Sequence, residues 1–184
     1  MGIILVTGPA RSGKSEWAEN LALKSNNLVI YLATAAVNSD DLDWMQRITK
    51  HRHRRPEHWL TWEVPELQLI DAIANSHASN HCLLVDSLGT WVANLLDRDD
   101  DQWEKIVLDL LFSLQQVTQD VIFVAEETGW GVVPAYPSGR TFRDRLGNLV
   151  RRIGSVSECV YLVTGGYALN LTTLGSPLPN CADI

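Results

Sequence analysis

The sequence predicts a three-layer α/β fold, in which helices cover both faces of a mostly parallel central sheet of five to six or more strands. Short apolar runs recur along the chain and are continuous rather than alternating, as expected for strands buried on both faces. Between them lie longer stretches with apolar residues at helical spacing, so strands and helices alternate. With 184 residues the chain is long enough for a sizeable core, and we expect a single domain over residues 1–184.

Five continuous apolar runs, and a weaker sixth, predict the strands of this sheet. In chain order they are Ile3–Val6, Leu28–Leu32, Cys82–Val85, Val121–Val124, Cys159–Val163 and, as the weak one, Ala168–Leu171. The stretches with helical spacing predict helices over Ser15–Lys24, Asp40–Thr49, Pro65–Ala74, Leu88–Leu96, Gln102–Val117 and Thr141–Ile153. Residues 172–184 contain proline, glycine and asparagine, and we expect a loosely ordered tail there.

Composition and charge argue against several classes of protein. The net charge of −7 argues against general nucleic-acid binding, which needs a positive field over the surface. No apolar run approaches the length of a transmembrane helix, and no secretory signal precedes the first apolar run. The three cysteines, Cys82, Cys159 and Cys181, are too far apart for a metal site or a disulfide framework. A reduced, cytoplasmic setting is therefore expected.

Residues 8–15, with the sequence GPARSGKS, fit the pattern G-x-x-x-x-G-K-[ST] of a phosphate-binding loop. An apolar run precedes them and a helical pattern follows, which is the context that such a loop requires and which disfavours a chance match. Lys14 is expected to reach the β- and γ-phosphates of a nucleotide, and the Ser15 hydroxyl to bind Mg²⁺. The expected fold is therefore P-loop NTPase-like. The loop residues expected to contact the nucleotide are Gly8, Pro9, Ala10, Arg11, Ser12, Gly13, Lys14 and Ser15.

Acidic residues follow two of the predicted strands, at the sheet edge where open α/β sheets bind ligands. Asp86 ends the third apolar run, where it would hold Mg²⁺ directly or through water. Its alternative role is to cap the helix that begins after Ser87. Glu126 and Glu127 end the fourth run, where they either orient a metal, a water or a substrate hydroxyl, or face solvent and cap the turn. The residues alone leave both pairs of alternatives open.

The densest basic cluster covers residues 50–55, with the sequence KHRHRR. A run of charge like this is usually a solvated helix end, where cations complement the helix dipole. Two alternatives are a nucleic-acid patch and a nucleotide site in which arginines neutralise phosphates and a histidine takes part. His51, His53 and His58 lack a fourth ligand at a spacing suited to zinc. Composition does not decide among the three interpretations.

A second group of arginines opens the last predicted helix. Arg140, Arg143 and Arg145 either contact phosphate or form a surface ion-pair face, and the ion-pair face is slightly favoured.

Seven segments, in order through nearly the whole chain, carry a resemblance that the phosphate loop alone does not. They are Thr7–Ser15 (TGPARSGKS), Tyr31–Thr34 (YLAT), Arg47–Trp59 (RITKHRHRRPEHW), Glu63, Leu83–Leu96 (LLVDSLGTWVANLL), Glu127–Pro134 (ETGWGVVP) and Arg140–Gly147 (RTFRDRLG). The combination of R-I-x-x-H-x-x-x-R-P-x-x-W with E-x-G-x-G-x-V-P is highly specific. With these motifs the chain resembles the bifunctional adenosylcobinamide kinase/adenosylcobinamide-phosphate guanylyltransferase family of cobalamin biosynthesis.

The resemblance implies an enzyme with two activities. As a kinase it would phosphorylate the side-chain hydroxyl of adenosylcobinamide with a nucleoside triphosphate. It would then transfer GMP from GTP to adenosylcobinamide phosphate through a guanylylated histidine, for which His51 falls on the matching position and His53 is the near neighbour. GTP, ATP or both would be substrates, together with Mg²⁺ held by Ser15 and Asp86, and the family is associated with a homotrimer. The further nucleotide contacts that it implies are Ala33, Thr34, Ala35, Arg52, His53, Arg54, Arg55, Glu63 and Asp86.

Pro9 and Glu126 are among the positions that depart from the pattern of the resembled family. Pro9 replaces a common glycine, which removes one backbone N–H from the phosphate loop. Glu126 stands where asparagine is frequent.

The alternative functions are a single-activity P-loop kinase for another small molecule and a nucleotide- or RNA-binding regulatory module. Core or interface packing is expected for most of the tryptophans that are candidates for contact with the corrinoid, namely Trp44, Trp59, Trp62, Trp91 and Trp130.

Overall fold

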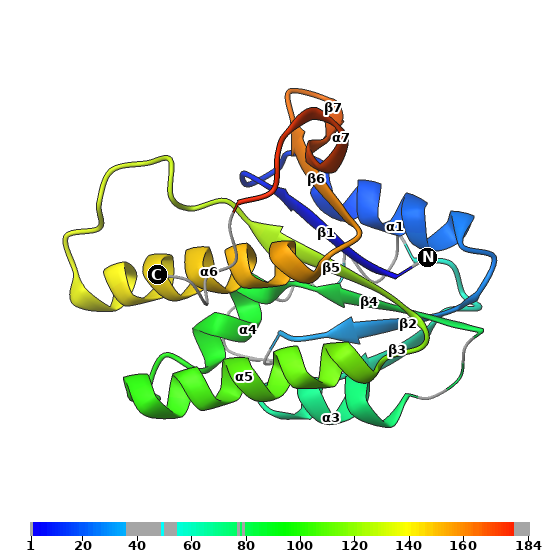
Figure 1. Cartoon of the computed structure of the whole chain (residues 1–184), viewed down its shortest axis with the longest axis horizontal. Helices are drawn as coiled ribbons and strands as arrows, with labels where there is room; N and C mark the ends of the chain where they lie inside the picture. The colour runs from blue at the N-terminus through cyan, green and yellow to red at the C-terminus, as the bar shows by residue number, and fades with distance from the viewer. Residues whose placement is uncertain (1, 36–48, 50–54, 77, 79, 179–184) are drawn as a thin grey trace.

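The computed structural model describes residues 2–35, 49, 55–76, 78 and 80–178, and it is built around one sheet (Figure 1). The sheet has seven strands in the order β3-β2-β4-β5-β1-β6-β7. They are β1 (Ile3–Gly8), β2 (Leu28–Ala33), β3 (Leu60–Glu63), β4 (His81–Asp86), β5 (Asp120–Glu126), β6 (Cys159–Thr164) and β7 (Tyr167–Asn170). All neighbouring strands are parallel except β6 and β7, which are antiparallel. The expected α/β architecture with a mostly parallel sheet is confirmed.

Helices cover both faces of the sheet, as the sequence predicts. In the described part of the chain they are α1 (Lys14–Lys24), α3 (Gln68–Asn75), α4 (Leu88–Asn94), α5 (Asp100–Gln116), α6 (Pro137–Val156) and the short α7 (Leu171–Leu174). One buried apolar cluster joins the sheet to α3, α4, α5 and α6, and a second joins it to α1. Alternate residues of β1 contribute to the two clusters, Leu5 to the first and Ile4 and Val6 to the second. Burial on both faces explains why the apolar runs are continuous.

Local sequence signals set several helix boundaries. Ser87 caps α4 and Asp99 caps α5, and each side chain accepts a hydrogen bond from the backbone N–H three residues later. Pro137 occupies the first turn of α6, so this helix begins there rather than at Thr141. The helix expected over residues 40–49 lies outside the described residues, apart from Thr49.

The two margins of the sheet differ from the sequence-based expectation. Strand β3 was not predicted, because its four residues are all exposed at the edge beside β2 and so lack an apolar run. The weak sixth run forms β7 one residue earlier than expected. It returns along β6 through Gly165 and Gly166, whose φ angles of 59° and 82° suit a two-residue hairpin turn.

The first residues of the expected loosely ordered tail are helical. Residues 171–174 form α7, and the Asn170 side chain accepts hydrogen bonds from the backbone N–H groups of Thr172 and Thr173. The Thr172 hydroxyl in turn accepts a bond from the backbone N–H of Val160 at 2.8 Å, which ties α7 to β6. Residues 179–184 lie outside the described part of the chain.

Candidate functional site

The carboxyl ends of the parallel strands bring predicted site residues to one edge of the sheet, on the left in Figure 1. In the pairing register, Ala33 at the end of β2 lies between Glu63 of β3 and Asp86 of β4. Two strands away, Gly8 at the end of β1 pairs with Glu126 at the end of β5. Residues from distant parts of the chain therefore form one row, at the edge where open α/β sheets bind ligands.

The phosphate loop connects β1 to α1 at this edge, and its conformation explains its glycines. Gly8 is buried against the backbone carbonyl of Val163, which leaves no space for a Cβ atom. Gly13 has a φ of 92°, a left-handed conformation that favours glycine, and it directly precedes Lys14 at the start of α1. The Ser12 hydroxyl is buried and has no hydrogen-bond partner among the described residues. A buried hydroxyl without a protein partner fits a loop built to bind an oxyanion.

Asp86 faces the phosphate loop rather than the helix that follows it. Ser15 Oγ donates a hydrogen bond to Asp86 Oδ1 at 3.4 Å, and the Tyr31 hydroxyl donates one to Oδ2 at 2.9 Å. Because Ser87 is the cap of α4, the alternative role of Asp86 as a helix cap is wrong. A hydroxyl and a carboxylate side by side are oxygen ligands that suit Mg²⁺ beside nucleotide phosphates.

Arg55, the described end of the basic cluster, contacts Tyr31 from the ring face. Its guanidinium carbon lies 3.3 Å from the ring centroid of Tyr31, and its Nη1 donates to Thr61 Oγ1 at 3.4 Å. Tyr31 is 2% exposed, and burial, followed by the charge of Asp86, raises its pKa well above the usual value. The hydroxyl therefore stays protonated and donates to Asp86. One buried ring thus separates the end of the basic cluster from the carboxylate at the phosphate loop.

The remaining basic-cluster positions that the sequence singled out, His51, Arg52, His53 and Arg54, lie outside the described residues. At Arg55 the contact with a buried ring differs from the solvated helix end that a charge run usually forms. Sequence reasoning missed Tyr31 as a site residue. A feature that could have indicated this role is the presence of one hydroxyl-bearing residue, Tyr31, within an otherwise aliphatic strand.

The predicted contacts at the end of β2 and β3 divide into buried and exposed residues. Thr34 is fully buried, and its hydroxyl donates to the Ser87 carbonyl at 2.8 Å and accepts from the Ser87 N–H at 3.0 Å. This side chain braces the turn between β4 and α4. Ala35 is half-buried, and Glu63 is exposed, so that the carboxylate of Glu63 is accessible at the sheet edge.

Glu126 and Glu127 have different partners. Glu126 Oε2 accepts a hydrogen bond from the Gly89 N–H at 2.9 Å in the first turn of α4, and a Cβ atom on Gly89 would collide with that carboxylate. Glu127 donates its backbone N–H to the Gly8 carbonyl at 2.9 Å, and its Oε1 accepts from the Thr7 hydroxyl at 3.4 Å. Glu126 therefore binds the first turn of α4, whereas Glu127 is bonded to the start of the phosphate loop.

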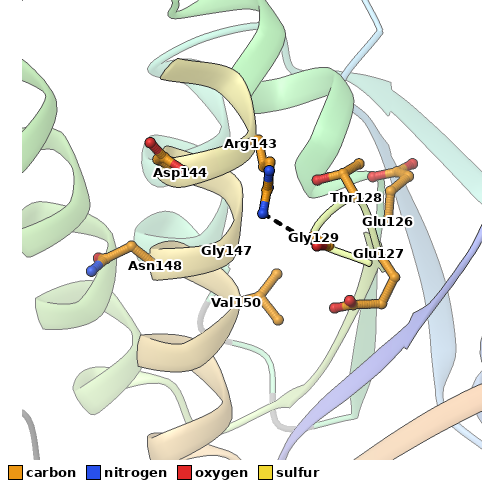
Figure 2. Close-up of a pocket in the computed structure, with 9 residues that line it drawn as sticks. All are labelled: Glu126, Glu127, Thr128, Gly129, Arg143, Asp144, Gly147, Asn148 and Val150. Atoms are coloured by element: carbon orange, nitrogen blue, oxygen red, sulfur yellow. Dashed lines mark hydrogen bonds between the residues drawn. The ribbon is translucent and has the colours of Figure 1, made fainter. Parts of the chain in front are cut away.

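A pocket of about 330 Å³ opens beside Glu127, between the end of β5 and α6 (Figure 2). Its lining residues are Glu126, Glu127, Thr128, Gly129, Arg143, Asp144, Gly147, Asn148 and Val150. In Figure 2 the side chains of Glu127, Arg143 and Val150 point into the space between strand end and helix, whereas Asp144 and Asn148 lie on the other side of α6. A carboxylate, a guanidinium and an apolar side chain therefore meet in this pocket.

Two arginines of α6 hold the loop that leads into the helix. Arg140 Nη1 donates to the carbonyls of Pro134 at 3.1 Å and Ala135 at 2.7 Å, and Arg143 Nη2 donates to the carbonyl of Gly129 at 3.3 Å. Within the described residues neither arginine has a carboxylate partner, so the slightly favoured ion-pair face is wrong for both. Their hydrogen bonds fix the loop between β5 and α6 to the helix.

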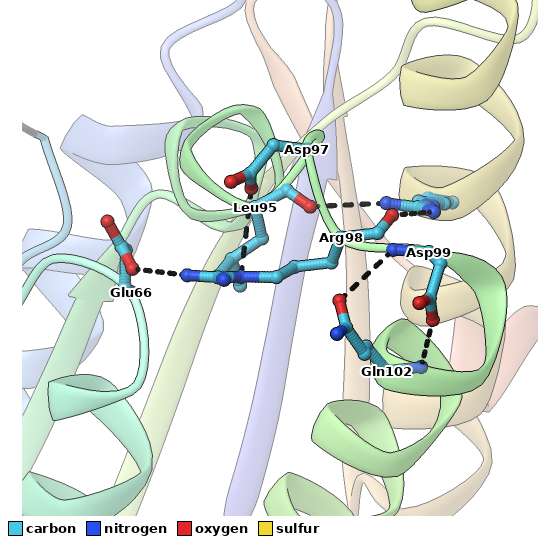
Figure 3. A network of polar contacts seen from close by, with 7 residues as sticks. Glu66, Leu95, Asp97, Arg98, Asp99 and Gln102 are labelled. Carbon is cyan, nitrogen blue, oxygen red and sulfur yellow. Dashed lines mark hydrogen bonds and ion pairs between the residues drawn. The ribbon is translucent and has the colours of Figure 1, made fainter.

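Arg145 supports the fold behind the site. It is 7% exposed, donates to the carbonyls of Leu95 and Arg98, and pairs with Asp100 at 3.1 Å. Figure 3 shows the contacts around Arg98, which itself bonds to Glu66 at 3.1 Å. The ion pair is thus buried on the arginine side and joins α6 to the start of α5, while the two hydrogen bonds join α6 to the connection between α4 and α5.

Within the described residues, no three His, Cys, Asp or Glu side chains lie together as a protein-only metal site would need. A Mg²⁺ ion held by Ser15, Asp86 and nucleotide phosphates does not require such a cluster. The same part of the chain holds no helix that is long and apolar enough to cross a membrane.

Comparison with known proteins points to one family. Residues 4–171 match the family model described as cobinamide kinase / cobinamide phosphate guanyltransferase. The bifunctional adenosylcobalamin biosynthesis protein CobP of Pseudomonas aeruginosa is 40% identical over 179 residues, with 95% of this chain and 98% of that protein covered. The bifunctional adenosylcobalamin biosynthesis protein CobU of Escherichia coli is 33% identical over 184 residues, with 92% and 99% covered. Among solved structures, the RadB recombinase covers 88% of this chain and 73% of its own, with a TM-score of 0.48 and 17% identity.

Proposed function

The chain belongs to the cobinamide kinase / cobinamide phosphate guanyltransferase family, and we infer that it carries out both reactions in cobalamin biosynthesis. As a kinase it transfers the γ-phosphoryl group of ATP or GTP to a hydroxyl of adenosylcobinamide, and the nucleoside diphosphate leaves. As a guanylyltransferase it joins the GMP unit of GTP to adenosylcobinamide phosphate, and pyrophosphate leaves.

The phosphate loop is the proposed site for the triphosphate. Backbone N–H groups of residues 8–15 would hold the phosphates, although Pro9 offers none, and the ammonium group of Lys14 would neutralise charge on the β- and γ-phosphates. Ser15 and Asp86 would hold Mg²⁺, which supplies positive charge beside the phosphates. The kinase reaction then depends mainly on positioning and charge neutralisation, because phosphoryl transfer demands little covalent chemistry of the protein.

His51 is the proposed nucleophile of the guanylyltransferase reaction, with His53 as its near neighbour. A ring nitrogen of the neutral imidazole attacks the α-phosphorus of GTP, the bond to pyrophosphate breaks, and a guanylyl-histidine forms. A phosphate oxygen of adenosylcobinamide phosphate then attacks that phosphorus and releases the imidazole, which gives adenosylcobinamide-GDP. The covalent intermediate divides one difficult transfer into two easier steps. Arg52, Arg54 and Arg55 would stabilise the charge that develops on the phosphate oxygens.

The contact between Arg55 and Tyr31 carries this part of the proposal. Arg55 packs on the ring of Tyr31, Tyr31 bonds to Asp86, and Asp86 bonds to Ser15 of the phosphate loop. The described end of the basic cluster is therefore near the loop that would hold the triphosphate. This proximity supports one site in which the basic cluster and the phosphate loop act on nucleotides together.

The nucleoside is proposed to lie along the end of β2 and β3. The exposed Glu63 carboxylate would accept hydrogen bonds from guanine N–H groups or ribose hydroxyls. Residues 33–35 would contact the nucleoside chiefly through their backbone, since the Thr34 hydroxyl is engaged by Ser87.

Covalent labelling tests the proposal. GTP labelled at the α-phosphorus should leave acid-labile, base-stable label on the wild-type protein, as a phosphoramidate does. His51→Ala should abolish the label, and the matched variant His53→Ala should retain it. Equal labelling of wild type and His51→Ala would contradict the role of His51. A protein that phosphorylates an acceptor without ever taking label would instead be a single-activity kinase.

A homo-oligomer, with a trimer as the expected state, is also proposed. Apolar side chains exposed at the β7–α7 edge support it, since Tyr167 is 75% exposed and Leu174 is 70% exposed beside an edge strand. A monomeric mass by light scattering would contradict it.

The net charge of −7 supports small-molecule rather than nucleic-acid partners. A cytoplasmic location is proposed because both reactions consume nucleoside triphosphates.

A further inference from the structure

We propose that the pocket between the end of β5 and α6 binds carboxamide side chains of the cobinamide acceptor, and that the loop over residues 128–136 covers the corrin ring. The inference rests on the proposed kinase and guanylyltransferase function, which names the acceptor but not its place in the fold. Cobinamide is a largely flat macrocycle with primary amides on its periphery. Its reactive hydroxyl is on a short arm that is itself linked through an amide.

The position of the pocket suits an acceptor. Its lining residue Glu127 donates a backbone hydrogen bond of 2.9 Å to Gly8, the first residue of the phosphate loop. Another lining residue, Glu126, is paired with the same glycine across β5 and β1. A nucleophilic hydroxyl must come within about 3–3.5 Å of the phosphorus that it attacks. The acceptor site must therefore adjoin the phosphate loop, and this pocket does.

The side chains that point into the pocket match a primary amide. The Glu127 carboxylate accepts hydrogen bonds from an amide N–H, and the Arg143 guanidinium donates to an amide carbonyl. Val150 supplies an apolar wall for the methylene groups of the same side chain. Gly147 leaves the helix surface open, because nothing lies within 4 Å of the position that its Cβ atom would take.

The loop that follows the pocket presents large apolar side chains to solvent. The exposed fractions are 67% for Trp130, 94% for Val132, 59% for Val133 and 78% for Tyr136. Exposed apolar groups gathered in this way mark a binding surface. The loop is nevertheless fixed to α6, since Arg143 holds the carbonyl of Gly129 and Arg140 holds the carbonyls of Pro134 and Ala135. An anchored apolar loop beside an amide-binding pocket suits a macrocycle whose periphery alternates methyl groups with amide side chains.

Gly147→Leu tests the pocket without endangering the helix. It adds a side chain to open space in the pocket, and replacement of a helical glycine favours helix formation. Ser155→Leu is the matched control, because it adds a similar side chain to an exposed position of α6 outside the pocket. A second variant, Trp130→Ser, removes one exposed apolar side chain from the loop.

Two quantities are measured: the KM values of the kinase reaction and the Kd of adenosylcobinamide. The Kd is obtained by equilibrium dialysis, in which the visible absorption of adenosylcobinamide gives its concentration. Gly147→Leu and Trp130→Ser should each raise the KM and Kd for adenosylcobinamide about tenfold, the equivalent of about 1.4 kcal/mol. The KM for the nucleotide and the rate of self-labelling with GTP should stay at the wild-type values, and Ser155→Leu should match wild type in every measurement.

Two results separate failure of this inference from failure of the proposed function. Unchanged KM and Kd for adenosylcobinamide in both Gly147→Leu and Trp130→Ser, in a protein whose wild type is active, would overturn the pocket as the acceptor site. A wild type without phosphoryl transfer and without self-labelling would overturn the proposed function itself. A lower oligomer mass for Trp130→Ser with unchanged cobinamide affinity would assign the loop to an interface between copies and would also overturn the inference.

Discussion

The Tyr31 hydroxyl donates a 2.9 Å hydrogen bond to Asp86. This bond joins the neighbouring strands β2 and β4 at the sheet edge where the phosphate loop lies. The same ring packs against Arg55, the described end of the basic cluster. A single buried side chain therefore contacts both parts of the chain that the proposed chemistry requires. Substitutions at these positions should separate the contribution of the hydroxyl from that of the ring.

Tyr31→Phe should lower the kinase kcat roughly tenfold, because Asp86 loses a hydrogen-bond donor worth about 1–2 kcal/mol while the ring beneath Arg55 remains. The measurement is kcat as a function of Mg²⁺ concentration, with a higher Mg²⁺ requirement expected in the variant. Tyr161→Phe on β6 is the control, since it keeps the edge contact between that ring and Trp17 of α1. Equal kcat and Mg²⁺ requirement in wild type and Tyr31→Phe would refute the role of the hydroxyl.

Arg55→Lys should slow covalent guanylylation by about tenfold or more while it keeps the charge. Lysine lacks the planar group that packs on the Tyr31 ring and that binds phosphate oxygens in pairs. The measurement is the single-turnover rate of labelling by α-labelled GTP, compared with that of Arg151→Lys on the exposed surface of α6. If both variants label at the wild-type rate, Arg55 takes no part in the reaction.

Gly89→Ala should destabilise the protein by about 1 kcal/mol, because the new methyl group displaces the Glu126 carboxylate and so breaks its hydrogen bond with the N–H of residue 89. Urea unfolding measures the change. Gly131→Ala is the control, because nothing lies within 4 Å of its Cβ position, and its effect should stay within about 0.5 kcal/mol. Similar free energies of unfolding for the two variants would show that the carboxylate moves freely.

Alkaline pH should destabilise the fold through Cys82. Burial, and less strongly the charge of Asp120, raises the pKa of its thiol from 9.0 to about 11. Between these two values the unfolded chain releases the proton and the folded chain keeps it, so the free energy of unfolding falls as pH rises, by about 2–3 kcal/mol in total. Below pH 9 the thiol contributes no pH dependence.

Urea unfolding of wild type and Cys82→Ala at about pH 8 and pH 10.5 isolates this contribution, since other groups titrate alike in both proteins. The wild type should lose more stability than Cys82→Ala over this interval. The same loss in wild type and Cys82→Ala would contradict the raised pKa of the buried thiol.

The sequence predicted the centre of the sheet better than its margins. Strands such as β1 and β5 are buried on both faces, and because both faces need apolar side chains, their sequences are continuous apolar runs. The exposed edge strand β3 has no such constraint. Likewise, the direction of β7 depends on the backbone at Gly165 and Gly166, which an apolar pattern does not encode.

The site was predictable where its residues are close in sequence. The phosphate loop is one local motif, and Asp86 ends a recognisable strand. The bond from Tyr31 to Asp86 spans 55 positions and depends on the pairing of β2 with β4, which no local pattern reveals. The partners of Arg140 and Glu126 were missed for a related reason: both bind backbone groups, whose places are set by the path of the chain rather than by residue type.

In the proposed mechanism one site at the sheet edge directs attack at the γ-phosphorus of a nucleotide in one reaction and at the α-phosphorus in the other, with His51 as the covalent carrier. The most direct measurement is a chase experiment on protein labelled with α-labelled GTP and freed of nucleotide. Addition of adenosylcobinamide phosphate should move the label from the peptide that contains His51 into adenosylcobinamide-GDP. Label that maps to another residue, or that stays on the protein when the acceptor is present, would contradict the role of His51 as the covalent carrier.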